Sequence, residues 1–184
     1  MFDEREDSPA PRASWSDRAT AIEAQAVDRA EGRRMLETVI TSDATAVELT
    51  RDELDVLLQC FQFFSIVSGR ELMSQDERGD YLVILLDGLV AVDRVQLWGD
   101  RVNLGESRMG DVLGEMSLLD AGPRFSTCTT LKTTRLAVLD AASLDRLMRD
   151  HPRIALALVT MLARRMSLRL RYVSTRLTAL LVRR

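Results

Sequence analysis

The stretch Gly79-Asp-Tyr-Leu-Val-Ile-Leu-Leu-Asp-Gly88 decides the fold class, because a run of strand-forming residues lies between two glycines. This alternation of strand-forming runs and glycines extends from residue 64 to residue 139. The glycines lie at positions 69, 79, 88, 99, 105, 110, 114 and 122. Between them lie short β-type runs at residues 81–86, 89–92, 95–98 and 135–139. Short strands that are separated by glycines at regular intervals predict an antiparallel roll or barrel.

Helical patterns flank this segment on both sides. Residues 17–41 lack proline and place apolar residues near helical spacing, which predicts one helix with Gly32 as its candidate breakpoint. Thr50 and Glu53 match a capping box, which predicts a short helix over residues 51–61. Beyond the glycine-rich segment, residues 141–149 predict a short helix, and Pro152 can begin a second helix that meets no breaker before the last residue.

Composition limits the class of protein. The chain has 184 residues, of which 46% are hydrophobic and 29% charged, as expected for one globular domain with a tail. No apolar run reaches the roughly 20 residues of a membrane span, and the acidic N-terminus does not resemble a signal peptide. Two distant cysteines and a single histidine argue against a disulfide scaffold or a metal site. We therefore expect a cytoplasmic protein without a metal or other cofactor.

The charge is distributed unevenly along the chain. Residues 1–60 carry 14 acidic and 7 basic residues, whereas residues 151–184 carry 8 arginines and no acid. Residues 1–16 are predicted to be disordered, and residues 17–48 form an acidic helical segment. A basic tail suits nucleic acid, an anionic membrane or an acidic partner segment. We expect residues 17–41 to pack near the arginines of the last helix; the alternative is that this helix caps the bottom of the roll with its acids solvated.

Three landmarks in order resemble the cyclic nucleotide-binding domain family, which includes catabolite-activator transcription factors and kinase A regulatory subunits. They are Ser-Gly-Arg-Glu-Leu at 68–72, the stretch 79–88, and Gly-Asp-Val-Leu-Gly-Glu-Met-Ser-Leu-Leu at 110–119 followed by Pro123-Arg124. The resemblance covers about residues 49–172. It implies an α+β fold with an eight-stranded, antiparallel, jelly-roll-like β-roll over residues 49–150. N-terminal helices would flank the roll, and a long dimerisation helix would follow over residues 151–184.

The resemblance also implies a phosphate-binding cassette over residues 114–127. In it Arg124 would meet the cyclic phosphate with two parallel N–H donors, and amides near Ser117 and Leu118 would add further donors. Glu115 would accept hydrogen bonds from the ribose 2′-hydroxyl. The implied ligand-binding residues are Gly114, Glu115, Met116, Ser117, Arg124, Phe125, Ser126 and Thr127.

The chain departs from the family pattern at three positions. Where the family has a small residue after Pro-Arg, this chain has Phe125, which would either overpack the phosphate site at a cost of ~1–3 kcal/mol or stack on a base for ~0.5–1.5 kcal/mol. Catabolite activators read adenine with a Thr-Ser pair that Arg169-Leu170 replaces here, so adenine specificity is not expected. Arg169 would either approach a guanine edge or face solvent, and we favour solvent. Asp76 stands where the family often has glycine.

The long helix carries an apolar seam whose members recur at alternating steps of four and three. A 30-residue helix is ~45 Å long and extends beyond a small roll, so the last part of the seam needs a second partner. We expect a parallel homodimer. The seam consists of Val159, Ala163, Met166, Leu170, Val173, Leu177 and Leu180.

These observations predict a regulatory module that responds to a cyclic nucleotide and acts on another protein, because no helix-turn-helix follows the long helix. Two other functions stay open. One is a degenerate roll that serves as a dimeric adaptor, with Phe125 closing the pocket. The other is an arginine-rich binder of nucleic acid or anionic membrane through residues 164–184. An enzyme is not expected, since no nucleophile–base pairing is recognisable.

Overall fold

The structure is a computed structural model in which residues 13–181 are described. Most of the predicted disordered tail lies outside the described residues. Its last part, from residue 13 to 16, is ordered, and the prediction was wrong there. Trp15 is buried and begins helix α1 (Trp15–Ala21), because its indole packs among the aromatic side chains of the roll.

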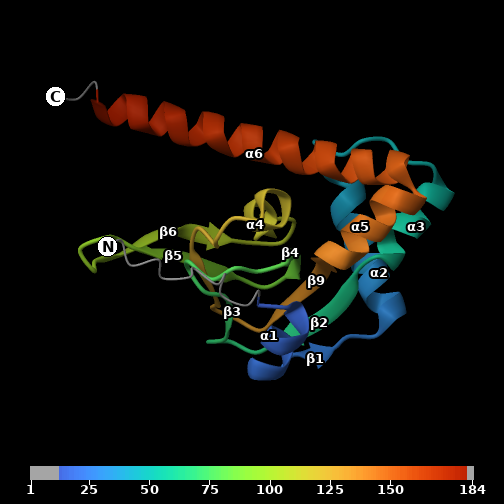
Figure 1. The fold of residues 1–184 in the computed structure, drawn as a ribbon, viewed down its shortest axis with the longest axis horizontal. Helices are drawn as coiled ribbons and strands as arrows, with labels where there is room; N and C mark the ends of the chain where they lie inside the picture. Colours follow the sequence, from blue (N-terminus) through green and yellow to red (C-terminus); the bar gives the residue numbers. More distant parts are fainter. Residues whose placement is uncertain (1–12, 182–184) are drawn as a thin grey trace, which may run out of the picture.

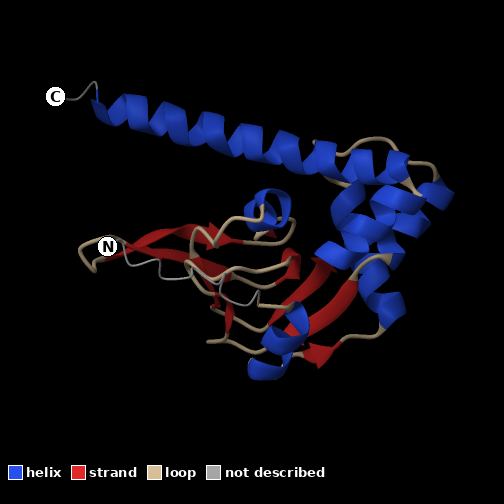
Figure 2. Cartoon of the chain, viewed as in Figure 1, coloured by secondary structure: helices blue, strands red, loops and turns tan. Residues whose placement is uncertain are grey.

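Two antiparallel sheets form the β-roll (Figures 1 and 2). One sheet has the order β1-β2-β9-β4-β7 and the other β3-β8-β5-β6. This confirms the predicted α+β class with an antiparallel roll. The strands are β1 (Gln25–Ala26), β2 (Gln62–Ile66), β3 (Glu71–Met73), β4 (Tyr81–Asp87), β5 (Val90–Val95), β6 (Arg101–Ser107), β7 (Val112–Leu113), β8 (Thr127–Thr130) and β9 (Thr134–Asp140).

Strand β4 has a continuous apolar sequence because both of its faces are buried. Tyr81, Val83 and Leu85 belong to the core inside the roll, whereas Leu82 and Ile84 belong to a second core between the sheet and the helices. Successive side chains of a strand point to opposite faces, so a strand that is covered on both faces must be apolar throughout.

The second core is closed by a layer of helices at one end of the roll (Figure 1). These are α2 (Arg29–Thr41), α3 (Arg51–Gln59), α5 (Ala141–Asp150) and the first turns of α6 (Pro152–Leu181). The capping box at Thr50 and Glu53 is present as predicted. Helix α6 then leaves this layer and extends past the roll. No helix within residues 13–181 is long and apolar enough to cross a membrane.

The single helix predicted over residues 17–41 was wrong. Helix α1 ends at Ala21, and the chain then forms strand β1, which pairs with Phe64 and Ser65 of β2 before α2 begins. Pairing with a distant strand thus outweighs local helical spacing. Gly32 does not break α2; it is buried inside the helix, where a Cβ would collide with the ring of Phe63.

The strand predicted over residues 95–98 was also wrong. Strand β5 ends at Val95, and Gln96 to Gly99 form the turn to β6, in which the amide of Gln96 donates to the carbonyl of Asp100 over 2.8 Å. Strand β6 was not predicted, because its apolar alternation is limited to Val102 and Leu104 and most of its residues are exposed.

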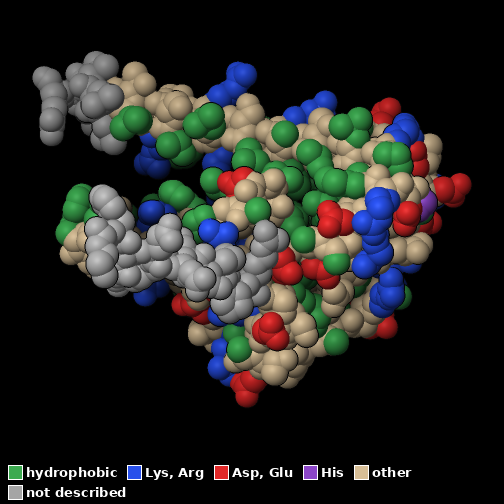
Figure 3. Space-filling model, viewed as in Figure 1, with side chains coloured by type: hydrophobic (Ala, Val, Ile, Leu, Met, Phe, Trp, Pro, Cys, Tyr) green, Lys and Arg blue, Asp and Glu red, His purple; other side chains and the backbone are tan. Residues whose placement is uncertain are grey.

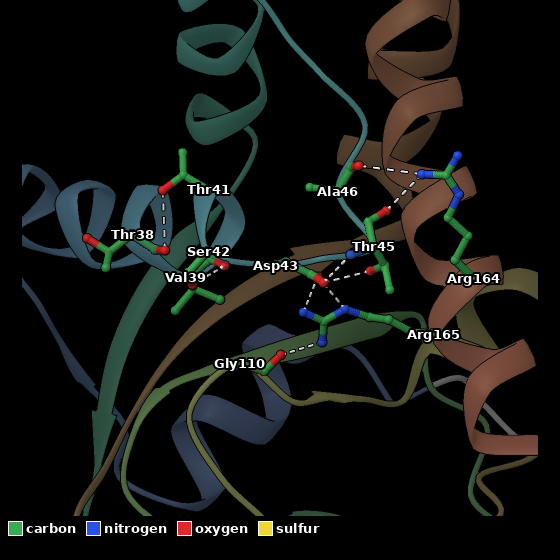
Figure 4. Close-up of polar contacts among 10 residues, drawn as sticks. All are labelled: Thr38, Val39, Thr41, Ser42, Asp43, Thr45, Ala46, Gly110, Arg164 and Arg165. Carbon is green, nitrogen blue, oxygen red and sulfur yellow. Dashed lines mark hydrogen bonds and ion pairs between the residues drawn. The ribbon is translucent and has the colours of Figure 1, made fainter. Parts of the chain in front are cut away.

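The acids of residues 17–41 do not cover the arginines of α6. Glu23, Glu31 and Glu37 pair instead with Arg70, Arg135 and Arg51. Arginines of α6 have partners elsewhere: Arg153 pairs with Glu53 of α3. In the loop after α2, Asp43 pairs with Arg165, and the carbonyls of Thr45 and Ala46 accept hydrogen bonds from Arg164 (Figure 4). The expected packing of residues 17–41 near the arginines of α6 was therefore wrong, because acids outside that range pair with Arg153 and Arg165.

Candidate functional site

A pocket of about 350 Å³ lies between the roll, the helix α4 (Glu115–Asp120) and α6. Met73, Val92, Leu113 and Cys128 supply its buried apolar floor. The polar groups come from the segment between Gly114 and Ser126 and from Arg169 of α6. Ligand sites of small molecules are commonly apolar hollows with few polar groups, and their volumes begin at roughly 300 Å³.

The backbone at Gly114 requires glycine. Its φ angle of +80° lies in the left-handed region, and a Cβ there would collide with the guanidinium of Arg124 and with Met73. The short helix α4 begins directly after this residue, so Gly114 turns the chain from β7 into the predicted cassette.

Arg124 is the most unusual side chain of the pocket, since it is a cation with only 2% of its surface exposed. Nη1 donates to the carbonyl of Gly114 over 2.8 Å and Nη2 to the carbonyl of Tyr81 over 2.7 Å. The guanidinium carbon lies 4.5 Å from the centre of the Tyr81 ring. Nε is buried without a hydrogen-bond partner, and Arg124 forms no ion pair with a carboxylate of residues 13–181.

A buried guanidinium that forms no ion pair is costly, because neutral carbonyls compensate only part of its lost hydration. Two of its five N–H groups donate to the carbonyls of Tyr81 and Gly114, and the buried Nε–H has no hydrogen-bond partner. The arrangement therefore favours an anion that enters the pocket.

Glu115 also lines the pocket and is only 7% exposed. Burial raises the pKa of its carboxyl group above the usual value, although Arg169, Arg124 and Arg165 oppose the shift. Nη1 of Arg169 lies 3.5 Å from its Oε1. The interpretation that Arg169 simply faces solvent was therefore incomplete: 56% of its side chain is exposed, yet it also lines the pocket.

Phe125 lies at the rim of the pocket and is 52% exposed. The guanidinium of Arg94 covers its ring at 4.4 Å and also donates to its backbone carbonyl. The ring thus lies at the pocket rim in contact with Arg94, and whether it obstructs a ligand or stacks on its base stays a prediction.

Of the eight predicted ligand-binding residues, all but Thr127 line the pocket, including Met116, Ser117 and Ser126. The hydroxyl of Thr127 instead accepts a hydrogen bond from the amide of Gln75 over 3.0 Å. Prediction missed the floor of the pocket, whose residues come from four separate strands, β3, β5, β7 and β8. It also missed Gly79, where a Cβ would collide with the guanidinium of Arg124.

Asp76 has a φ of +64°, so it adopts the left-handed conformation for which glycine is the usual residue. Its amide donates to the carbonyl of Arg124 over 2.9 Å. The departure from the family pattern at this position is thus a strained turn that holds the end of the cassette.

The predicted seam on α6 stays open in one chain. Leu170, Val173 and Leu177 are 67%, 54% and 56% exposed, and Ala163 is exposed as well. Val159 and Met166 are partly buried near the roll, and the side chain of Leu180 lies outside the described part of the chain. Figure 3 shows hydrophobic and basic side chains along the far half of this helix.

Residues 64–151 match the family model described as "Cyclic nucleotide-binding domain", so the chain contains a domain of this family. This confirms the family that the glycine landmarks and Pro123-Arg124 indicated. The matched segment includes the whole cassette and most of the roll.

Two curated relatives are similar to this region. The cyclic AMP receptor protein of Thermus thermophilus is 32% identical over 118 residues, which cover 64% of this chain and 55% of the relative. The CRP-like cAMP-activated global transcriptional regulator of Mycobacterium tuberculosis is 34% identical over 53% of this chain and 44% of the relative. The chain thus spans about half the length of these relatives.

Solved structures confirm the fold. A cyclic nucleotide-binding domain from Methylobacillus flagellatus aligns with a TM-score of 0.74 over 83% of this chain and 85% of that chain, at 23% identity. The catabolite activator protein of Thermus thermophilus aligns with a TM-score of 0.60 at 32% identity, over 72% of this chain and 60% of that chain.

Proposed function

We propose that the protein binds a cyclic mononucleotide in the pocket beside Arg124 and transmits the binding to a partner protein. The observation that carries this proposal is the buried guanidinium of Arg124, whose Nε–H has no hydrogen-bond partner and which forms no ion pair with a carboxylate of the described residues. A cyclic phosphodiester carries one negative charge and two free oxygens, which suit a planar donor group.

The remaining groups fit the other parts of such a ligand. The carboxylate of Glu115 can accept hydrogen bonds from the ribose hydroxyl, in exchange for its long contact with Arg169. Phe125 and Val173 offer apolar surface to a base at the rim and under α6. Neither Arg169 nor Leu170 reproduces the polar pair that reads adenine in catabolite activators, so we propose no preference for adenine.

Helix α6 supports the second half of the proposal. It lines the pocket with Arg169 and Val173, and its exposed seam continues beyond the roll through Leu177. We propose that two copies pair in parallel along this seam. A ligand that changes the contacts of α6 would then alter the surface that the dimer presents to its partner, which makes the protein a regulatory module and not an enzyme.

Thermal unfolding with cyclic AMP, cyclic GMP and cyclic dinucleotides tests the binding. A ligand at 100 times its dissociation constant stabilises the fold by about 2.7 kcal/mol, and Arg124→Ala should abolish that shift. Arg135→Ala is the matched control, because Arg135 is exposed and pairs with Glu31 away from the pocket. If no nucleotide at millimolar concentration moves the melting temperature of the unmodified chain, the adaptor function is correct instead.

A further inference from the structure

Residues 13–22, here called the N-terminal segment, lie outside the part of the chain that matches the family model. The segment consists of Ala13, Ser14, helix α1 and Ile22, and it packs against the roll (Figure 1). Three separate contacts connect this segment to the groups that hold Arg124.

The first contact is a chain of stacked side chains. Trp15 is 3% exposed and meets the Tyr81 ring at a centroid distance of 5.2 Å and an interplanar angle of 69°. The same tyrosine carries the guanidinium of Arg124 at 4.5 Å from its ring and accepts a hydrogen bond from it through the backbone. The hydroxyl of Tyr81 donates to the carbonyl of Leu72 over 2.6 Å, so the position of the ring is fixed at its far end as well.

The second contact runs through the backbone. The amide of Ala13 donates to the carbonyl of Arg78 over 2.6 Å, and Ala13 forms a parallel bridge with Gly79. Gly79, like Gly114, lacks a Cβ that would collide with the guanidinium of Arg124. A shift of Ala13 would therefore move the backbone on which the guanidinium rests.

The third contact is an ion pair between Arg18 and Glu77, whose side chains are only 16% and 18% exposed. The carbonyl of Glu77 accepts the hydrogen bond of the Arg124 amide over 2.7 Å, and its carboxylate accepts one from the amide of Ser74 over 2.9 Å. The pair thus fixes the turn that holds the main chain of Arg124.

We propose that the N-terminal segment is a positioning element for Arg124 and thereby sets the affinity of the pocket for cyclic nucleotides. This inference rests on the proposed function. Trp15 acts through Tyr81, Ala13 through Gly79, and Arg18 through Glu77. Coupling between two sites is reciprocal, so a bound nucleotide also holds the segment more tightly on the roll. Whatever pulls the segment away lowers nucleotide affinity.

Calorimetric titration with cyclic AMP and with cyclic GMP tests the proposal. Trp15→Ala should weaken binding at least about fivefold, the lower end of typical coupling between sites. Trp15→Phe should bind with an affinity within about twofold of that of the unmodified chain. It keeps an aromatic ring next to Tyr81, and the indole N–H that it removes is buried without a partner. Arg18→Glu should also weaken binding, and the double change Arg18→Glu with Glu77→Arg should recover it.

A control separates positioning from general destabilisation. Leu57→Ala changes a residue of α3 that is 2% exposed. Leu57 belongs to the core between the sheet and the helices and does not line the pocket. The substitution should lower the melting temperature without changing the dissociation constant. If Trp15→Ala changes affinity no more than Leu57→Ala does, the segment is only structural and the proposal is wrong.

A second measurement needs no nucleotide and separates this inference from the proposed function. The chain has two tryptophans, so Trp98→Phe leaves Trp15 as the single reporter. In that background Arg124→Ala should shift the Trp15 emission or its quenching by iodide, whereas Arg135→Ala should not. A chain that binds no nucleotide refutes the proposed function alone; an unchanged Trp15 signal in Arg124→Ala refutes the coupling.

Discussion

Arg165 of α6 and Asp43 of the loop after α2 form a two-point contact, in which Nε and Nη2 of the guanidinium both donate to Oδ2 of the carboxylate, the first over 2.7 Å (Figure 4). The third nitrogen of Arg165 donates to the carbonyl of Gly110, which precedes β7. One turn further along α6, Arg169 reaches Glu115 in the pocket. The clasp between Arg165 and Asp43 therefore fixes the direction in which α6 crosses the pocket.

The first prediction concerns this clasp. The Asp43 side chain is 7% exposed, and Asp43→Asn should lower the free energy of unfolding by about 2 kcal/mol, since hydrogen bonds to charged groups contribute ~1.5–3 kcal/mol. Urea denaturation measures the change. Glu106→Gln breaks an exposed pair with Arg108 and should cost at most about 1 kcal/mol. Equal effects of the two substitutions would show that the clasp is no more important than a surface pair.

The same carboxylate gives a pH dependence. Burial alone would raise the pKa of Asp43, but hydrogen bonds from Thr45 and Arg165 outweigh it and lower the pKa. A folded pKa below the unfolded value of about 3.9 means that this stabilisation is present above that pH and is lost as the pH falls through the folded value. The difference in unfolding free energy between the parent and Asp43→Asn should therefore shrink as the pH falls below about 4. A difference that is constant between neutral and acidic pH contradicts this account.

The second prediction concerns Glu115, whose carboxyl group has a raised pKa because it is buried. The carboxylate form accepts hydrogen bonds from ribose, so nucleotide affinity should fall as the pH is lowered from neutrality. The fall should begin at a higher pH than an ordinary glutamate with a pKa of about 4.3 would give. Glu115→Gln should bind more weakly at neutral pH and lose most of this pH dependence. Titrations over a pH series with ribo- and 2′-deoxyribonucleotides measure both effects; a parent that binds the deoxyribonucleotide equally well contradicts the role of Glu115.

Phe125 carries the third prediction. Its ring is half exposed at the rim and already stacks with Arg94, so Phe125→Ala should change stability by less than about 1 kcal/mol. The loss of stacking on a base should weaken nucleotide binding by ~0.5–1.5 kcal/mol, or about two- to twelvefold. Phe125→Tyr keeps the aromatic face and serves as the control. A gain of affinity in Phe125→Ala would mean that the ring obstructs the pocket after all.

Features that depend on residues close together in the sequence were predicted correctly, whereas features that depend on distant residues were missed. The apolar run of β4, the capping box at Thr50 and the turn at Gly114 depend on neighbouring residues, and the structure has all three. Strand β1 was missed because it exists only through its pairing with Ser65 and Phe64 of β2. The exposed strand β6 has only Val102 and Leu104 as an alternating apolar pattern, which is too short to indicate a strand by itself.

The pocket shows the same difference between local and distant residues. The motif identified Arg124 and Glu115, whereas the residues that hold them come from distant parts of the chain. Tyr81 lies 43 positions before Arg124, and Arg169 lies 54 positions after Glu115. No local signal connects such residues, so their roles require the three-dimensional arrangement.

The last prediction is that the chain forms a dimer through α6. Leu170 and Leu177 are 67% and 56% exposed on one face of a helix that the roll of its own chain does not cover. Leu170→Glu combined with Leu177→Glu should give a monomer, because an ionised carboxylate buried in an interface without a partner costs several kcal/mol. Leu168→Glu is the matched control: Leu168 is 57% exposed on the same helix but lies off the seam, so the dimer should persist. Sedimentation velocity at tens of micromolar distinguishes the three proteins. A monomeric parent chain would exclude the seam as a dimer interface, and a control that dissociates as well would place the interface on another face of α6.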